Sequence, residues 1–206
     1  MPFGLATAPA TFERLMDKIM RGIQWKKCLV YLDDIICLGA HLKDAIDNLE
    51  EVFQRVRKSG LKLKPSKCDL LKEQVQFLGH LVNREGIQCD SKKIEAVKAY
   101  PKPKNLHDVR AYLGFVGYYR KFIPNFATKA VPLTKLLKKE EPFMWGPAQE
   151  EAFQELREPL MKGPLLVYPD LTQPLILDTD ASGFALGGVL SQIRDGGERV
   201  IAYTKR

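Results

Sequence analysis

The sequence CLVYLDDIICL at residues 28–38 places two adjacent carboxylates, Asp33 and Asp34, between two apolar arms. Both arms have strand length and are rich in β-branched and aromatic residues, which predicts a β-hairpin with Asp33 and Asp34 in its tight turn. Two-residue hairpin turns prefer Asn-Gly or Asp-Gly because they need positive φ angles, and no glycine stands here. Two repelling carboxylates at such a corner are either solvated on a surface turn or direct their oxygens at a cation.

The composition sets limits on the class of protein. The 206 residues suffice for two small domains, and 32 basic against 25 acidic residues give a net charge of +7, a weak indication of a polyanionic partner. No apolar run approaches the roughly 20 residues of a membrane span, and no secretory leader is recognisable. The four cysteines and three histidines follow no zinc spacing, which favours free thiols in a reducing compartment. We therefore expect an intracellular, non-secreted chain without a membrane partner, in the cytoplasm or the nucleus.

Hydrophobic periodicity predicts a mixture of helices and strands along the chain. Helical spacing is found at residues 7–20, 42–58, 92–100, 105–123, 127–138 and 149–161, with Asn105 as an N-cap. Strand-like patterns are found at residues 61–82, 165–168, 175–180, 185–192 and 198–203, with Asp195-Gly196-Gly197 as a hairpin connection. We expect the helix at 42–58 to pack beneath the 28–38 hairpin.

Two further features suggest chemistry. Lys and Arg interleave with Tyr between residues 92 and 135, as on a surface that follows a duplex backbone, although solvated helix faces explain the same composition equally well. Asp180 ends an apolar strand, where a buried or half-buried acid is unfavourable unless it is hydrogen-bonded or bound to metal. Asp180 is therefore a second candidate site.

Seven short motifs follow one another along the chain. They are MPFGL at 1–5, APATF at 8–12, YLDD at 31–34, KLKPSKC at 62–68, FLGH at 77–80, YYRKFI at 118–123 and TDAS at 179–182. In this order they resemble the reverse transcriptases of gypsy-type LTR retrotransposons, over essentially the whole chain. Four residues such as YLDD recur by chance, whereas the ordered set is specific.

The resemblance implies an α+β fold, a partial polymerase palm with a helical thumb followed by the first strands of an RNase H-like domain. It divides the chain into three parts. Residues 1–82 resemble the C-terminal part of the palm with its primer-grip hairpin, residues 83–140 the thumb, and residues 141–206 a connection helix and the N-terminal part of the RNase H-like domain.

The resemblance also implies roles for individual residues. Asp33, as principal ligand, and Asp34, as supporting ligand, would bind Mg²⁺, or alternatively Mn²⁺, for template-directed nucleotidyl transfer, in which carboxylate oxygens hold two hard cations about 4 Å apart. Asp180 resembles the first metal-binding carboxylate of the RNase H site, with Asp178 as the competing candidate. The remaining implied contacts are Pro2, Phe3, Gly4 and Tyr31 with nucleotide and template, Phe77, Leu78, Gly79 and His80 as the primer grip, and Lys62, Lys64, Lys67, Arg110, Arg120 and Lys121 with the duplex backbone. Phe3 and Phe77 can also be explained as packing residues.

The implied partners are an RNA–DNA or DNA primer–template, deoxynucleoside triphosphates and the remainder of the Pol polyprotein. The family takes a further essential Asp from a strand before the Pro2-Phe3-Gly4 loop and further RNase H carboxylates from later elements, and neither stands in this sequence. Two carboxylates on one turn diverge, so a two-ion site made of Asp33 and Asp34 alone would be weak. We expect an RNA-directed DNA polymerase and RNase H family member that does not polymerise by itself. The alternatives are a non-catalytic duplex-binding remnant and a decayed fragment without function.

Overall fold

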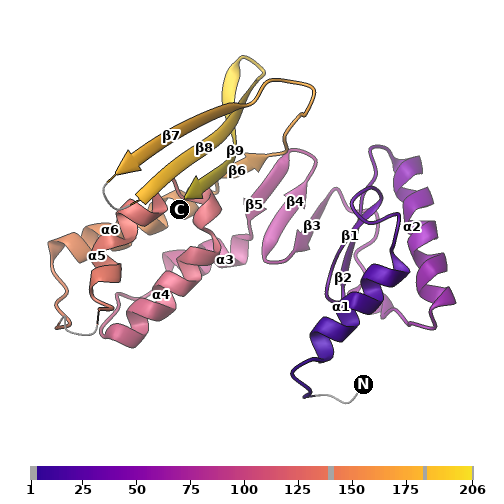
Figure 1. Ribbon diagram of the computed structural model, residues 1–206, viewed down its shortest axis with the longest axis horizontal. Coiled ribbons are helices and arrows are strands. Elements are labelled where there is room, and N and C mark those ends of the chain that lie inside the picture. Colours follow the sequence, from indigo (N-terminus) through magenta and orange to yellow (C-terminus); the bar gives the residue numbers. More distant parts are fainter. Residues whose placement is uncertain (1–3, 139–141, 183–184, 206) are drawn as a thin grey trace. The chain divides into compact units, whose positions relative to one another are not determined.

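The computed structural model describes residues 4–138, 142–182 and 185–205 (Figure 1). The chain divides into two compact units, Met1–Phe77 and Leu78–Arg206, and each is described by itself. Both units contain helices and antiparallel strands in separate runs, so the expected α+β class is confirmed.

The first unit is built on the predicted hairpin. Its elements are α1 (Ala8–Ile19), β1 (Cys28–Tyr31), β2 (Asp34–Cys37), α2 (Leu42–Lys58), a short 3₁₀ helix η1 (Pro65–Lys67) and β3 (Gln74–Phe77). β1 and β2 pair in antiparallel register. Met16 and Met20 from the α1 region and Val52 and Val56 from α2 are buried together with Cys28 of β1. The expected packing of the 42–58 helix on the hairpin is confirmed.

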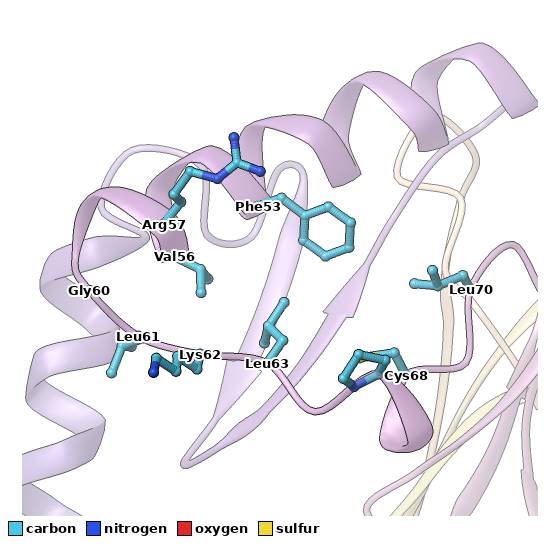
Figure 2. A pocket seen from close by; sticks show the side chains of 10 residues that line it. Phe53, Val56, Arg57, Gly60, Leu61, Lys62, Leu63, Cys68 and Leu70 are labelled. Atoms are coloured by element: carbon cyan, nitrogen blue, oxygen red, sulfur yellow. The ribbon is translucent and has the colours of Figure 1, made fainter.

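Residues 61–73 differ from the expected strand. Only Gln74–Phe77 forms a strand there, and the preceding segment is a loop with one 3₁₀ turn. Pro65 lacks an N–H for a ladder, and Leu61 packs on the buried cluster of this unit instead of alternating across a sheet. Figure 2 shows Leu63 of this loop facing Phe53 and Val56 of α2 across an open, mostly apolar groove.

The second unit begins with short antiparallel strands and continues with helices. Its elements are β4 (His80–Asn83), β5 (Gly86–Cys89), α3 (Ser91–Lys98), α4 (Leu106–Tyr118), the 3₁₀ helix η2 (Arg120–Phe122), α5 (Phe126–Lys135), α6 (Pro147–Met161) and β6 (Leu165–Val167). β5 pairs with both β4 and β6. The side chain of Asn105 accepts a hydrogen bond from Asp108 N at 2.9 Å, which confirms the predicted N-cap of α4.

A second, three-stranded antiparallel sheet ends the described chain. It consists of β7 (Ile176–Ser182), β8 (Ala185–Arg194) and β9 (Gly197–Lys205), with β8 in the middle (Figure 1). The turn between β8 and β9 contains Asp195 and Gly196, whose φ angles of 51° and 74° are those a tight two-residue hairpin needs. The predicted hairpin connection is confirmed.

The helices of the second unit share one apolar core. The Tyr112 hydroxyl of α4 donates to the Phe153 carbonyl of α6 at 2.7 Å, and both rings are buried. Leu133 of α5 is buried in the same cluster, and Val200 and Tyr203 of β9 pack against it. The three-part division at residues 82 and 140 stays a prediction, and within this unit the buried core includes residues from both sides of position 140. Of the described helices, none is long and apolar enough to cross a membrane.

Candidate functional site

The acidic hairpin turn is formed by Leu32 and Asp33. Asp34 is the first residue of β2 and pairs with Tyr31, so the expectation that both aspartates occupy the turn is wrong for Asp34. Leu32 takes a φ angle of 52° and thereby supplies the left-handed conformation in place of a glycine. Such a conformation costs a non-glycine residue about 1–2 kcal/mol, and strain of this kind is concentrated at functional sites.

Both carboxylates of this turn are open to solvent. Asp33 and Asp34 are exposed, and the neighbouring Tyr31 keeps 49% of its surface accessible. Within the described ranges, neither carboxylate takes part in an ion pair or a side-chain hydrogen bond. The hairpin therefore presents two neighbouring carboxylates that no described side chain neutralises, which is the arrangement that suits a cation site.

Asp180 does not lie in the environment that its sequence context predicts. It pairs with Gly187 on β7, an edge strand, and its side chain is exposed. Asp178 lies on the same face of the strand, and Leu177 on the other face is 61% accessible. The expected burial of Asp180 is wrong, because both faces of this edge strand are open. The structure does not distinguish Asp180 from Asp178.

The motif at residues 77–80 forms a tight turn that leads into β4. Phe77 ends β3, while Leu78 and Gly79 form the turn with φ angles of 48° and 69°. Two positive φ angles in succession are typical of a type I′ turn. The Tyr118 hydroxyl donates to the Leu78 carbonyl at 2.6 Å, and the Tyr119 hydroxyl donates to the Gly79 carbonyl at 3.1 Å.

The imidazole of His80 packs inside an aromatic cluster directly behind this turn. It stacks on Tyr118 with ring centroids 5.5 Å apart and meets Tyr119 edge-on at 5.6 Å. Phe122 lies at 5.6 Å on a third side. Burial, and secondarily the Lys121 ammonium, lower the pKa of His80 to about 4, so the ring is neutral at pH 7. His80 thus acts as a packing residue of the turn, with its ring turned inward.

The predicted backbone-binding cations divide into two kinds. Exposed members are Lys62, Lys64, Lys67, Arg110 and Arg120. In the portion of the chain that is described, no ion pair involves any of these five. Lys121 differs, since it is half-buried, its ammonium lies 5.3 Å from the centre of the Phe122 ring, and burial lowers its pKa. Lys121 is therefore less available to a phosphate than the other five.

Comparison with known proteins assigns the two ends of the chain to protein families. Residues 1–82 match the family "Reverse transcriptase (RNA-dependent DNA polymerase)", and residues 145–206 match "RNase H-like domain found in reverse transcriptase". The Pol polyprotein of transposon 297 from Drosophila melanogaster is 45% identical over 193 residues, 93% of this chain and 18% of that protein. That of transposon 412 from the same organism is 39% identical over 206 residues, 100% of this chain and 17% of that protein.

Solved structures agree with these relatives. The foamy viral protease-reverse transcriptase in complex with dsDNA superimposes with a TM-score of 0.82 at 25% identity, covering 100% of this chain and 43% of that one. The same viral protein in complex with an RNA/DNA hybrid gives a TM-score of 0.81 at 25% identity, covering 100% of this chain and 28% of that one. The chain belongs to the reverse transcriptase and RNase H family of retrotransposon Pol polyproteins. It spans less than a quarter of the length of the curated relatives it matches.

Reverse transcriptases and RNases H generally use divalent metal ions, and the described part of this family member fits such ions only in part. Asp33 and Asp34 supply exposed oxygen ligands, but no group of three or more His, Cys, Asp or Glu side chains gathers anywhere in residues 4–138, 142–182 and 185–205. A stable Mg²⁺ site takes near-octahedral oxygen coordination, which two neighbouring carboxylates do not complete. Asp33 and Asp34 by themselves therefore do not complete a metal site among the described residues.

Of the residues predicted to contact nucleotide and template in the loop at residues 2–4, the structure describes Gly4. Pro2 and Phe3 lie outside the described residues. Gly4 takes a φ of 91°, and a Cβ built on it meets no atom of the described residues within 4 Å, so among these residues nothing prevents close approach to its backbone.

Sequence reasoning missed two features of the site. The apolar run predicts Leu32 as a strand residue, although the absence of glycine from the turn signals that another residue must take a positive φ angle. Tyr118 and Tyr119 belong to the YYRKFI motif, but no local pattern indicates that their hydroxyls reach a turn 40 residues earlier.

Proposed function

We propose that this chain is the palm and thumb part of an RNA-directed DNA polymerase, followed by the start of its RNase H-like domain. The observation that carries the proposal is the β1–β2 hairpin, which exposes the carboxylate of Asp33 in its turn and that of Asp34 next to it, neither of them ion-paired among the described residues, in a chain of this family. The substrates would be a primer–template duplex and deoxynucleoside triphosphates, and the metal would be Mg²⁺, or alternatively Mn²⁺.

Asp33 in the turn and the two residues that flank the turn, Tyr31 and Asp34, each have a defined part in this proposal. Divalent ions, when bound, activate the primer 3′ hydroxyl and neutralise the triphosphate. Asp33, at the tip of the hairpin, is the principal ligand, and Asp34, anchored by its pairing with Tyr31, is the supporting one. Tyr31 keeps about half of its residue surface accessible beside them and offers a ring on which the primer end can rest.

Binding of a duplex is supported by the related structures and by charge. The foamy viral protein is bound to dsDNA or an RNA/DNA hybrid in the structures that resemble this chain. Lys62, Lys64, Lys67, Arg110 and Arg120 are exposed cations that can displace counterions from phosphates. The turn of Leu78 and Gly79 would serve as the primer grip, and the remainder of a Pol polyprotein would be a covalent partner.

The RNase H-like part would contribute Asp180 as its first metal ligand. The strand that carries Asp180 is open on both faces, so further carboxylates could approach it from other segments of a longer chain. An intracellular location agrees with the four free cysteines, since thiols persist in reducing compartments.

The polymerase proposal is tested with a longer Pol polypeptide that contains this chain. Primer extension on an RNA template is measured for the unchanged protein and for Asp33→Asn, with Asp17→Asn, an exposed aspartate on α1, as the matched control. We expect Asp33→Asn to reduce extension at least 100-fold, because the carboxylate charge that holds the metal is removed, and we expect the control to be unaffected. Extension that survives Asp33→Asn contradicts the proposal.

A second function is favoured by the incomplete set of carboxylates among the described residues. The 206-residue chain by itself would bind primer–template duplexes without chemistry. Fluorescence anisotropy with a labelled duplex should then give an affinity that falls steeply with salt and does not change with Asp33→Asn. Primer extension by the isolated chain, abolished by Asp33→Asn, would contradict this second function and support the first.

A further inference from the structure

The turn of Leu78 and Gly79 is held from outside by two tyrosines that are 40 residues away in the sequence. The Tyr118 hydroxyl donates to the Leu78 carbonyl at 2.6 Å and the Tyr119 hydroxyl donates to the Gly79 carbonyl at 3.1 Å. Tyr118 is the last residue of α4, and Tyr119 follows it as the C-cap. Both carbonyls of one two-residue turn are thus bound by the end of one helix.

The turn needs such support because its backbone is strained. Leu78 takes a φ of 48°, in the left-handed region that a leucine rarely adopts. In a free hairpin the strain would favour other turn conformations, because a non-glycine residue at this φ is unfavourable. Two hydroxyl donors that bind consecutive carbonyls select the one conformation in which both carbonyls face the helix.

The neighbouring side chains keep the tyrosines in place. Tyr119 is 3% and Phe122 1% accessible, and the ring of His80 stacks on Tyr118 and contacts both of the others. A Cβ built on Gly79 would lie 3.2 Å from the Tyr119 hydroxyl and 3.6 Å from the Tyr118 ring. The tyrosines therefore approach the turn as closely as a glycine backbone allows.

We propose that Tyr118 and Tyr119 are positioning residues that fix the turn of Leu78 and Gly79 through its carbonyls and so couple the primer grip to the end of the thumb helix α4. The role in positioning a primer rests on the proposed function, whereas the mechanical link between α4 and the turn does not. A shift of the C-terminal end of α4 is transmitted to the backbone of residues 78–79 by two hydrogen bonds.

The link is tested first without nucleic acid. Amide hydrogen exchange of residues 77–83 is compared between the unchanged chain, Tyr118→Phe, Tyr119→Phe and the double variant. These substitutions keep the rings and remove only the hydroxyls, and we expect the double variant to exchange about tenfold faster, because two hydrogen bonds that oppose opening are lost. Tyr112→Phe is the matched control. It also removes a hydrogen bond from a tyrosine hydroxyl of α4 to a carbonyl, but the acceptor is Phe153 and not the turn.

The outcomes separate the link from other effects. Tyr112→Phe should leave exchange at residues 77–83 unchanged, and unchanged exchange in the double variant would overturn the link. Tyr118 is 54% exposed, so Tyr118→Phe gives a folded test even where the buried Tyr119→Phe perturbs the core.

The role in positioning is tested with a primer that carries the fluorescent base 2-aminopurine at its 3′ end. We expect the double variant to bind the duplex within about threefold of the unchanged chain, because the phosphate contacts remain, while the fluorescence of the terminal base changes. Unchanged fluorescence together with faster exchange would overturn positioning. If the unchanged chain does not bind the duplex, the second proposed function, duplex binding by the chain alone, fails together with the positioning role, while the exchange experiment still decides the link.

Discussion

His80 shows how one side chain makes the stability of the second unit depend on pH. Its ring is enclosed by Tyr118, Tyr119 and Phe122, and it pairs across the β4–β5 ladder with buried Cys89. Burial and the nearby Lys121 ammonium lower the pKa of the imidazole from 6.5 to about 4. The folded unit therefore binds a proton on His80 less readily than the unfolded chain does.

This shift predicts a loss of stability in mild acid. The contribution of His80 is fully present above pH 6.5 and is lost as the pH falls towards 4, because protonation favours the unfolded state in that interval. At about 1.4 kcal/mol per pKa unit, the loss is on the order of 1–3 kcal/mol. Urea unfolding of a Trp25→Phe background, followed by Trp145 fluorescence at pH 7 and pH 4.5, measures it.

Two variants identify His80 as the source of this pH dependence. His80→Phe should reduce the difference in the free energy of unfolding between pH 7 and pH 4.5, although it changes the packing as well. His107→Gln should leave this difference in unfolding free energy unchanged, since 90% of the His107 side chain is accessible. Equal pH dependence in the unchanged chain and in His80→Phe would show that other groups cause the loss.

Leu32 is the residue for which the sequence was least informative. The apolar run at residues 28–32 predicted a strand that continues through Leu32, and the structure ends β1 at Tyr31. Alternation of side chains cannot reveal which residue takes a positive φ angle when no glycine is present, because the choice depends on the register of the whole hairpin. The position of Asp33 in the turn is nevertheless predictable, since apolar arms on both sides limit where the chain can reverse.

At the scale of elements, β5 joins two strands that are far apart in the sequence. Gly86 pairs with Val167 of β6, and the strand also pairs with β4. A Cβ built on Gly86 would collide with the Leu166 carbonyl oxygen and lie 3.1 Å from the Leu165 side chain. The backbone of β6 can approach β5 this closely only because residue 86 has no side chain.

Gly86→Ala is therefore expected to destabilise the second unit by about 2–4 kcal/mol, as overpacking against backbone does. Gly114→Ala is the matched control, because a Cβ on this α4 glycine meets nothing within 4 Å and alanine favours helix by about 0.5–1 kcal/mol. Thermal unfolding should show a lower midpoint for the first variant and an equal or higher one for the second. If Gly86→Ala unfolds at the same midpoint temperature as the unchanged chain, β6 can move away from β5 without lowering the stability of the second unit.

Elements with strong local signals were predictable and those that depend on distant partners were not. The Asn105 cap and the Asp195-Gly196 turn use side chains and φ angles that the sequence itself displays. β5 gave no alternating pattern, and its pairing with β6 depends on a segment almost 80 residues away. Asp180 ends an apolar run, but its exposure is decided by whether other strands cover β7, which the run cannot reveal.

At the scale of the whole molecule, part of the positive charge is carried by exposed Lys and Arg side chains that take part in none of the described ion pairs. Lys62 and Lys64 precede η1 and Lys67 ends it in the first unit, and Arg110 and Arg120 lie on α4 and η2 in the second. Other lysines are already paired, such as Lys98 with Glu95 and Lys162 with Glu158. Net charge alone therefore does not say which cations are available to a duplex.

The salt dependence of duplex binding separates specific cations from net charge. Lys62→Gln, Lys64→Gln and Lys67→Gln together lower the net charge from +7 to +4, since three positive charges are removed. If all three contact phosphates, the slope of log K against log salt falls in magnitude by about 3, because each contact releases about 0.9 counterion. Arg110→Gln with Arg120→Gln should lower it by about 2 on the same grounds.

A control of equal charge decides between contact and long-range attraction. Lys43→Gln, Lys98→Gln and Lys162→Gln also change the net charge from +7 to +4, and two of these three lysines are paired with glutamates. Net charge acts at long range and is screened beyond roughly 8 Å in physiological salt, so these changes should alter the slope by less than about 1. Equal slopes for the two triple variants would mean that the lysines around η1 make no phosphate contacts, and that the first unit attracts a duplex only through its overall charge.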